Sequence, residues 1–174
     1  IPSRLVGSEM CIRDSHLSGA SRGVDPTYQY GAISGKDANL TINNTLIEDV
    51  LFPIYINGGS IDLRDSEIHC EFTCDFINVK NGTANIDGNT FFGSNAIDTD
   101  AIDLDGVTNG HVKGNRIYNL KGFNSDGIDI GEMSSNIVIE KNLIYNSGDK
   151  GVSVGQGSNA VSYTHLRAHE TRRY

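Results

Sequence analysis

The chain has 174 residues and a formal net charge of −8, with 14 Lys and Arg against 22 Asp and Glu. This acidic balance argues against a nucleic-acid partner, because phosphate binding needs clustered Lys and Arg. No apolar stretch approaches the ~18 residues of a membrane-spanning helix, so no membrane span is expected.

The two ends of the chain mirror each other at the level of their codons. When residues 1–15 are read forward and 160–174 backward, every facing pair can be encoded by complementary codons; Met10 faces His165, and Cys11 faces Thr164. Both segments resemble translations of one sequencing-adapter sequence, and such segments are set aside from fold reasoning. The alternative is a natural inverted repeat at the boundary of a mobile element. On either interpretation we expect the ends to carry no selected fold and the remainder to be a truncated fragment, with the rest of its structure missing.

Residues 16–37 are rich in Gly, Ser and Tyr, and we interpret them as a degenerate coil or an N-terminal flank without an assignable register. From residue 38 to 159, two short signatures recur in step five times. The first places two apolar residues five positions apart and starts at Ile42, Leu63, Ile86, Val112 and Ile139. The second alternates apolar, polar and apolar residues at 54–56, 77–79, 102–104, 128–130 and 152–154. Two independent signatures in step predict a structural repeat of about 21–27 residues.

The repeat unit has the pattern of short strands. Its apolar residues alternate with a period of two, and Gly, Asn, Asp and Ser fill the connections, as turns require. Each coil would bury its apolar face only against its neighbours, so we predict an all-β solenoid of about five coils. Within it, one small polar position per coil predicts a stacked turn ladder of Thr45, Ser66, Asn89, Asn115 and Asn142.

The same register gathers aspartates on one face. Alternation turns the middle residue of each triplet outward, which gives a column of Tyr55, Asn78, Asp103, Asp129 and Ser153. The residues two positions before the start of each triplet are Phe52, Asp75, Asp100, Asp126 and Lys150. Asp100, Asp103, Asp126 and Asp129 should therefore cluster. Stacked like charges repel, and three outcomes stay open: a carboxyl that retains its proton, Ca²⁺ held by these four aspartates, or solvated turn residues.

The range 38–159 resembles the right-handed parallel β-helix proteins of the carbohydrate-binding and sugar-hydrolase type. Residues 124–130 (NSDGIDI) are similar to the NTDGIDI stretch of polygalacturonases. That resemblance implies that Asp126 acts with an acidic pair one coil later, where this chain has Asp149 followed by Lys150. It also implies a secreted or cell-surface protein whose partner is a polysaccharide or a cell-surface glycan.

We therefore expect a polysaccharide-binding or polysaccharide-processing face. Asp103, Asp126, Asp129 and Asp149 are the candidate catalytic residues, and Asp100 and Lys150 are candidate substrate-binding residues. Tyr118 and Tyr145 occupy matching positions and predict either a sugar-stacking strip or a turn-packing pair. The alternative is a non-catalytic surface solenoid of the adhesin kind. Cys70 and Cys74 are either a disulfide pair or two free thiols.

Overall fold

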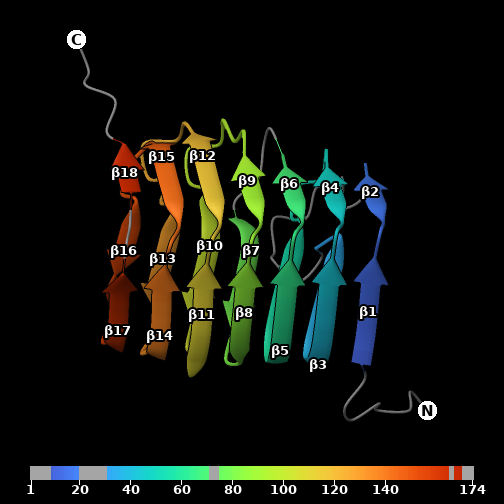
Figure 1. Ribbon diagram of the computed structural model, residues 1–174, viewed down its shortest axis with the longest axis horizontal. Coiled ribbons are helices and arrows are strands. Elements are labelled where there is room, and N and C mark those ends of the chain that lie inside the picture. The colour runs from blue at the N-terminus through green and yellow to red at the C-terminus, as the bar shows by residue number, and fades with distance from the viewer. Residues whose placement is uncertain (1–8, 20–30, 71–74, 165–166, 170–174) are drawn as a thin grey trace.

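The computed structural model describes residues 9–19, 31–70, 75–164 and 167–169, and it describes residues from 159 onward by their backbone alone. Every regular element among them is a β-strand, and all strand pairs are parallel. Successive coils stand side by side in chain order, from the N-terminal strands at one end to the C-terminal strands at the other (Figure 1). The predicted all-β right-handed solenoid of about five coils is confirmed.

The strands lie in three rows that form three faces of the solenoid. The first row contains β7 (Asp75–Lys80), β10 (Asp100–Asp105), β13 (Ile128–Gly131) and β16 (Val152–Val154), together with the first halves of β3 (Ile33–Asn43) and β5 (Ile54–Arg64). The second contains β1 (Glu9–Arg13), the second halves of β3 and β5, β8 (Thr83–Asp87), β11 (Asn109–Lys113), β14 (Ser135–Glu140) and β17 (Asn159–Thr164). The third contains β2 (His16–Ser18), β4 (Leu46–Glu48), β6 (Glu67–His69), β9 (Thr90–Phe92), β12 (Arg116–Leu120), β15 (Leu143–Ser147) and β18 (Arg167–His169).

The first two rows join in one 11-stranded sheet because β3 and β5 bend between them. The first half of β5 pairs with β7 and its second half with β8. The bend in β5 falls at Gly58 and Gly59, whose φ angles are 78° and 84°. A Cβ atom at Gly59 would lie 2.1 Å from the Ala38 carbonyl oxygen, so this corner requires glycine.

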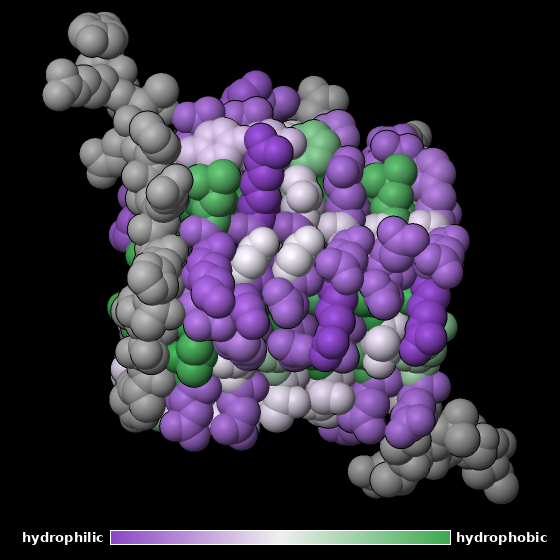
Figure 2. Space-filling view, viewed as in Figure 1, coloured by the Kyte–Doolittle hydropathy of each residue, from purple (hydrophilic) through white to green (hydrophobic). Residues whose placement is uncertain are grey.

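The core follows from the two signatures. The first and last residues of the first four triplets point inward, and Ile77, Ile102 and Ile128 stack on one another with no exposed surface. The outside of the second and third rows is largely hydrophilic with isolated apolar side chains (Figure 2). Cys70 is also buried, and it is a free cysteine whose thiol pKa rises to about 11 because of that burial. Cys74 lies outside the described residues.

The predicted polar ladder is present at the corner between the second and third rows. The Asn89 backbone N–H donates to Asn115 Oδ1 at 2.9 Å, and the Asn115 N–H donates to Asn142 Oδ1 at 2.9 Å. The Asn115 side-chain amide also donates to the Ile86 carbonyl oxygen at 2.8 Å. Ser66 and Thr45 extend the ladder toward the N-terminus. Each buried side chain thus satisfies backbone groups of neighbouring coils and fixes their register.

The stack continues beyond the predicted range of 38–159. His16–Ser18 pairs in register with β4, and Ile33 pairs with Ile54, so part of the 16–37 stretch has an assignable register. Strands β1, β17 and β18 also extend the stack through the two terminal segments. The adapter origin of those segments stays a prediction. Among the described residues there is no helix that could span a membrane.

We predict that Asn115→Ala lowers the free energy of unfolding by about 2–4 kcal/mol, because it leaves the Asn89 N–H and the Ile86 carbonyl buried without their partner. The matched control is Asn109→Ala on an exposed strand position, which should change it by less than about 0.5 kcal/mol. Urea denaturation followed by circular dichroism measures both. Equal losses in the two variants would contradict a ladder role.

Candidate functional site: an acidic strand face

The candidate site is the outer surface of the first row of strands, which we call the acidic face. Its central column pairs in the predicted register, since Tyr55 lies beside Asn78, Asn78 beside Asp103, Asp103 beside Asp129, and Asp129 beside Ser153. The register prediction is therefore confirmed. Asp103 is more buried than a solvent-facing residue, at 9% exposure, because the side chains of adjacent coils lie directly on either side of it. Asp129 is half-buried.

A second column, at the start of these strands, forms another ladder. The Asp100 N–H donates to Asp75 Oδ1 at 3.2 Å, and the Asp126 N–H donates to Asp100 Oδ1 at 2.8 Å. The Lys150 N–H donates to Asp126 Oδ1 at 2.7 Å. One oxygen of each carboxyl group therefore holds the backbone of the next coil. Asp100 and Asp126 lie where the sequence places them, and both have a structural role.

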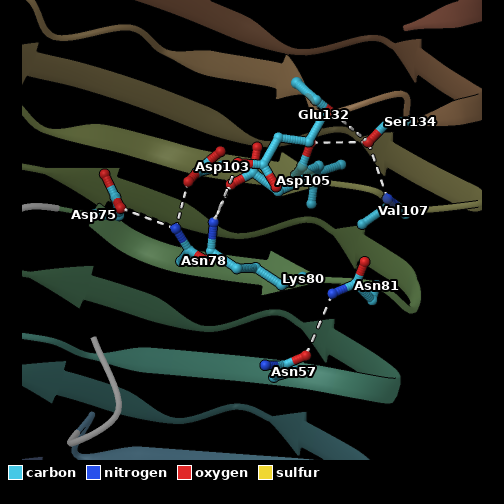
Figure 3. Close-up of polar contacts among 12 residues, drawn as sticks. Asn57, Asp75, Asn78, Lys80, Asn81, Asp103, Asp105, Val107, Glu132 and Ser134 are labelled. Atoms are coloured by element: carbon cyan, nitrogen blue, oxygen red, sulfur yellow. Dashed lines mark hydrogen bonds and ion pairs between the residues drawn. The ribbon is translucent and has the colours of Figure 1, made fainter. Parts of the chain in front are cut away.

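Asn78 joins the two columns. Its side-chain nitrogen donates to Asp75 Oδ2 at 3.1 Å and also to Asp103 Oδ2 (Figure 3). The Asn78 side chain is 4% exposed, and its Oδ1 atom is buried without a hydrogen-bond partner. Asn78 thus orients both carboxyl groups through a single amide nitrogen. Sequence reasoning placed Asn78 in the column but gave it no role.

Burial and mutual repulsion raise the pKa values of the carboxyl groups on this face. The pKa of Asp103 rises to about 9, first because of burial and then because of Asp75, Asp105 and Asp100 nearby. Burial and then the charges of Asp75, Asp126 and Asp129 raise the pKa of Asp100 to about 8. The pKa of Asp75 rises to about 6, chiefly through burial. Burial also raises the pKa of Asp126. Asp103 and Asp100 therefore retain a proton at neutral pH.

The two lysines beside these aspartates are both engaged in ion pairs. Lys80 Nζ lies 2.5 Å from Asp105 Oδ2 and 3.8 Å from Glu132 Oε1 (Figure 3). Lys150 Nζ lies 3.7 Å from Asp126 Oδ2 and pairs with the Asp149 carboxylate.

Lys80 and Asp105 were missed by sequence reasoning. They pair directly in the register of β7 and β10, so the opposite charges at matching repeat positions were a usable signal.

The remaining predicted residues lie at the edge of this arrangement. Asp149 is exposed and contacts Lys150 rather than the central column. The Asp129 carboxyl has no hydrogen bond or ion pair within the described part of the chain. Nor do the described residues include three His, Cys, Asp or Glu side chains arranged to hold a metal ion. The calcium hypothesis for Asp100, Asp103, Asp126 and Asp129 thus stays a prediction.

Tyr118 and Tyr145 lie on the third row, away from the acidic face, and belong to a continuous ring stack. His69, Phe92, Tyr118 and Tyr145 follow one another with ring centroids 4.4, 5.0 and 5.0 Å apart and interplanar angles of 1–4°. The Arg116 Nη2 atom donates to the Tyr145 hydroxyl at 2.9 Å. Both faces of the Tyr118 ring are covered by its neighbours. This geometry favours the packing interpretation, because a sugar stacks on an open ring face.

Comparison with known proteins agrees with this architecture. The family model described as "Right handed beta helix region" matches residues 6–166. The chain belongs to the right-handed β-helix family. No curated protein and no solved structure gives a significant match. Family membership accounts for the stacking of the coils, and the acidity of the stacked columns is a property of this sequence.

We predict that the free energy of unfolding falls as the pH rises from about 4 to about 9, and that Asp103→Asn weakens this dependence. In that window the unfolded chain has released the Asp103 proton while the folded chain keeps it, so stability decreases by about 1.4 kcal/mol per pH unit for such a group. Below pH 4 both states hold the proton and the effect disappears. Denaturation at pH 5, 7 and 9 measures it. Parallel pH profiles for the two proteins would contradict the raised pKa.

Proposed function

We propose that the acidic face binds a polysaccharide and supplies acid–base chemistry to it. The observation that carries the proposal is the pair of neighbouring outward residues Asp103 and Asp129. Asp103 keeps its proton at neutral pH, and Asp129 presents a carboxyl group without a protein partner in the described chain. Glycoside cleavage needs one carboxyl group as a proton donor and a second as base or nucleophile. In this proposal Asp103 is the donor and Asp129 is the second group.

The ladder of Asp75, Asp100 and Asp126 changes the role that the polygalacturonase resemblance implies for Asp126. One oxygen of Asp126 holds the Lys150 backbone, and the other faces the Lys150 ammonium group, so Asp126 positions the coil that follows it. In the proposal Asp100 and Asp126 are supporting residues. Asp149 and Lys150 form the exposed edge of the face, where they can contact bound sugar.

The charge of the face favours a neutral or amino-sugar polymer over a uronic-acid polymer. Both lysines beside the aspartates are paired with carboxylates, so neither is available to neutralise a uronate. A polysaccharide partner further implies a secreted or cell-surface location, which belongs to the same proposal.

One observation favours a second candidate function, a non-catalytic display solenoid. Asp75, Asp100 and Asp126 each accept a backbone N–H from the next coil, as a purely structural column would. A display solenoid needs no free carboxyl group in the neighbouring column. The two functions therefore differ in what they require of Asp103 and Asp129.

We predict that Asp129→Asn and Asp103→Asn each weaken glycan binding by at least about tenfold or lower turnover by about 100-fold, since each removes one partner of the pair. Binding is measured by calorimetry with 1,4-linked hexasaccharides of glucose, N-acetylglucosamine, glucosamine and galacturonate, and turnover by reducing-end release. The neutral or amino sugars should bind more tightly than galacturonate.

The matched control is Asp87→Asn on the second row, which should leave binding and turnover unchanged. If no hexasaccharide binds, or if Asp103→Asn and Asp129→Asn both behave like the wild type, the polysaccharide proposal fails and the display solenoid is favoured.

A further inference from the structure

We propose that the depression beside Tyr55 is a sugar-binding subsite, in which the Tyr55 ring stacks on one pyranose unit of a glycan lying along the solenoid axis. The choice of a glycan as ligand rests on the proposed function. The location of the subsite rests on separate observations, which concern the N-terminal half of the acidic face rather than its aspartates.

The first observation is a surface depression of about 340 Å³ that is lined by Ser34, Gly35, Lys36, Tyr55 and Asn57. Its size falls at the lower end of small-ligand sites. A hydroxyl, an ammonium and a side-chain amide surround one aromatic ring there. An aromatic platform rimmed by hydrogen-bonding groups suits a pyranose, which has apolar C–H faces and polar hydroxyl edges.

The second observation concerns the contacts of the Tyr55 ring and hydroxyl. Its hydroxyl accepts a hydrogen bond from Asn57 Nδ2 at 3.4 Å, two positions along the same strand. That contact leans the ring along β5. The Tyr55 ring takes part in none of the stacked pairs found in the described part of the chain, because its column neighbours are Ser34 and Asn78 rather than aromatic residues. Tyr55 therefore lacks the aromatic neighbours that cover both faces of the Tyr118 ring, and it lines the depression instead.

The third observation is alignment with the proposed reacting groups. Tyr55, Asn78, Asp103 and Asp129 occupy the same outward position in four successive coils. Coils are spaced by roughly 4.8 Å, so Tyr55 lies roughly 9.6 Å from Asp103 along the axis. This spacing is close to the length of two pyranose units in an extended glycan. A sugar held at Tyr55 would place a later unit of the same chain beside Asp103 and Asp129.

The unpaired charge of Lys36, next to the Tyr55 column, fits the same placement. Lys36 lies beside Asn57 in the register of β3 and β5 and makes no ion pair within the described residues. Its ammonium group can donate to sugar hydroxyls, in contrast to Lys80 and Lys150, which are paired with carboxylates. The subsite end of the face thus offers donors, whereas the aspartate end offers proton transfer.

The test uses the absence of tryptophan from the sequence. In Tyr55→Trp the new indole is the only tryptophan, so its fluorescence reports directly on this position. We expect its emission to change in a saturable way with the hexasaccharide that binds the wild type most tightly. The matched control is Phe92→Trp in the ring stack of the third row, whose emission should not respond. Tyr55→Ala should weaken binding about tenfold in calorimetry while the thermal melting curve stays cooperative.

The outcomes separate this inference from the proposed function. If the wild type binds and Asp129→Asn weakens binding, but the emission of Tyr55→Trp does not change and Tyr55→Ala binds normally, the subsite is wrong and the acidic face stands. If the emission of Tyr55→Trp changes and the aspartate variants bind and turn over glycan normally, the subsite stands and the acid–base proposal falls. If no hexasaccharide binds the wild type, both are overturned.

Discussion

The structure depends on one constraint, which is the vertical register of the coils. Two ladders enforce it at different corners and in opposite directions. In the Asn ladder, a backbone N–H of one coil donates to the side chain of the following coil, as Asn89 does to Asn115. In the Asp ladder, the N–H of the following coil donates back, as Asp126 does to Asp100. Where both ladders are present, they tie a coil to both of its neighbours through hydrogen bonds that slippage would break.

That register also creates the electrostatic problem of the acidic face. Residues at equivalent positions lie one strand spacing apart, so repeated aspartates must repel or change their ionisation. The chain limits the repulsion in three ways. Backbone N–H groups stabilise the column of Asp75, Asp100 and Asp126. An amide, Asn78, replaces a carboxyl beside Asp103. The remaining repulsion, added to burial, leaves Asp103 protonated at neutral pH. A proton donor thus arises from the repeat itself.

The sequence was sufficient for the features that depend on register alone. The triplets at 102–104 and 128–130 predicted that Asp103 and Asp129 would be neighbours, and they are. Features that depend on side-chain conformation were not predictable in this way. Nothing in the spacing showed that one Asn78 nitrogen would contact two carboxyl groups. The ring stack around Tyr118 could have been predicted from the sequence, because aromatic residues in register on neighbouring strands lie face to face.

Where a column repeats the same kind of residue, its side chains satisfy one another and leave little for a ligand. The Asn ladder and the ring stack are both of this type. Where a column changes residue, a group is left with unused capacity for interaction. Tyr55 lies between Ser34 and Asn78 and has no aromatic neighbour in its column, and Asp129 lies beside Ser153 and makes no hydrogen bond or ion pair within the described residues. Both interruptions fall on the same outward column. The proposed function therefore uses the positions of this column where the repeat is broken, which the regular columns of the other rows do not offer.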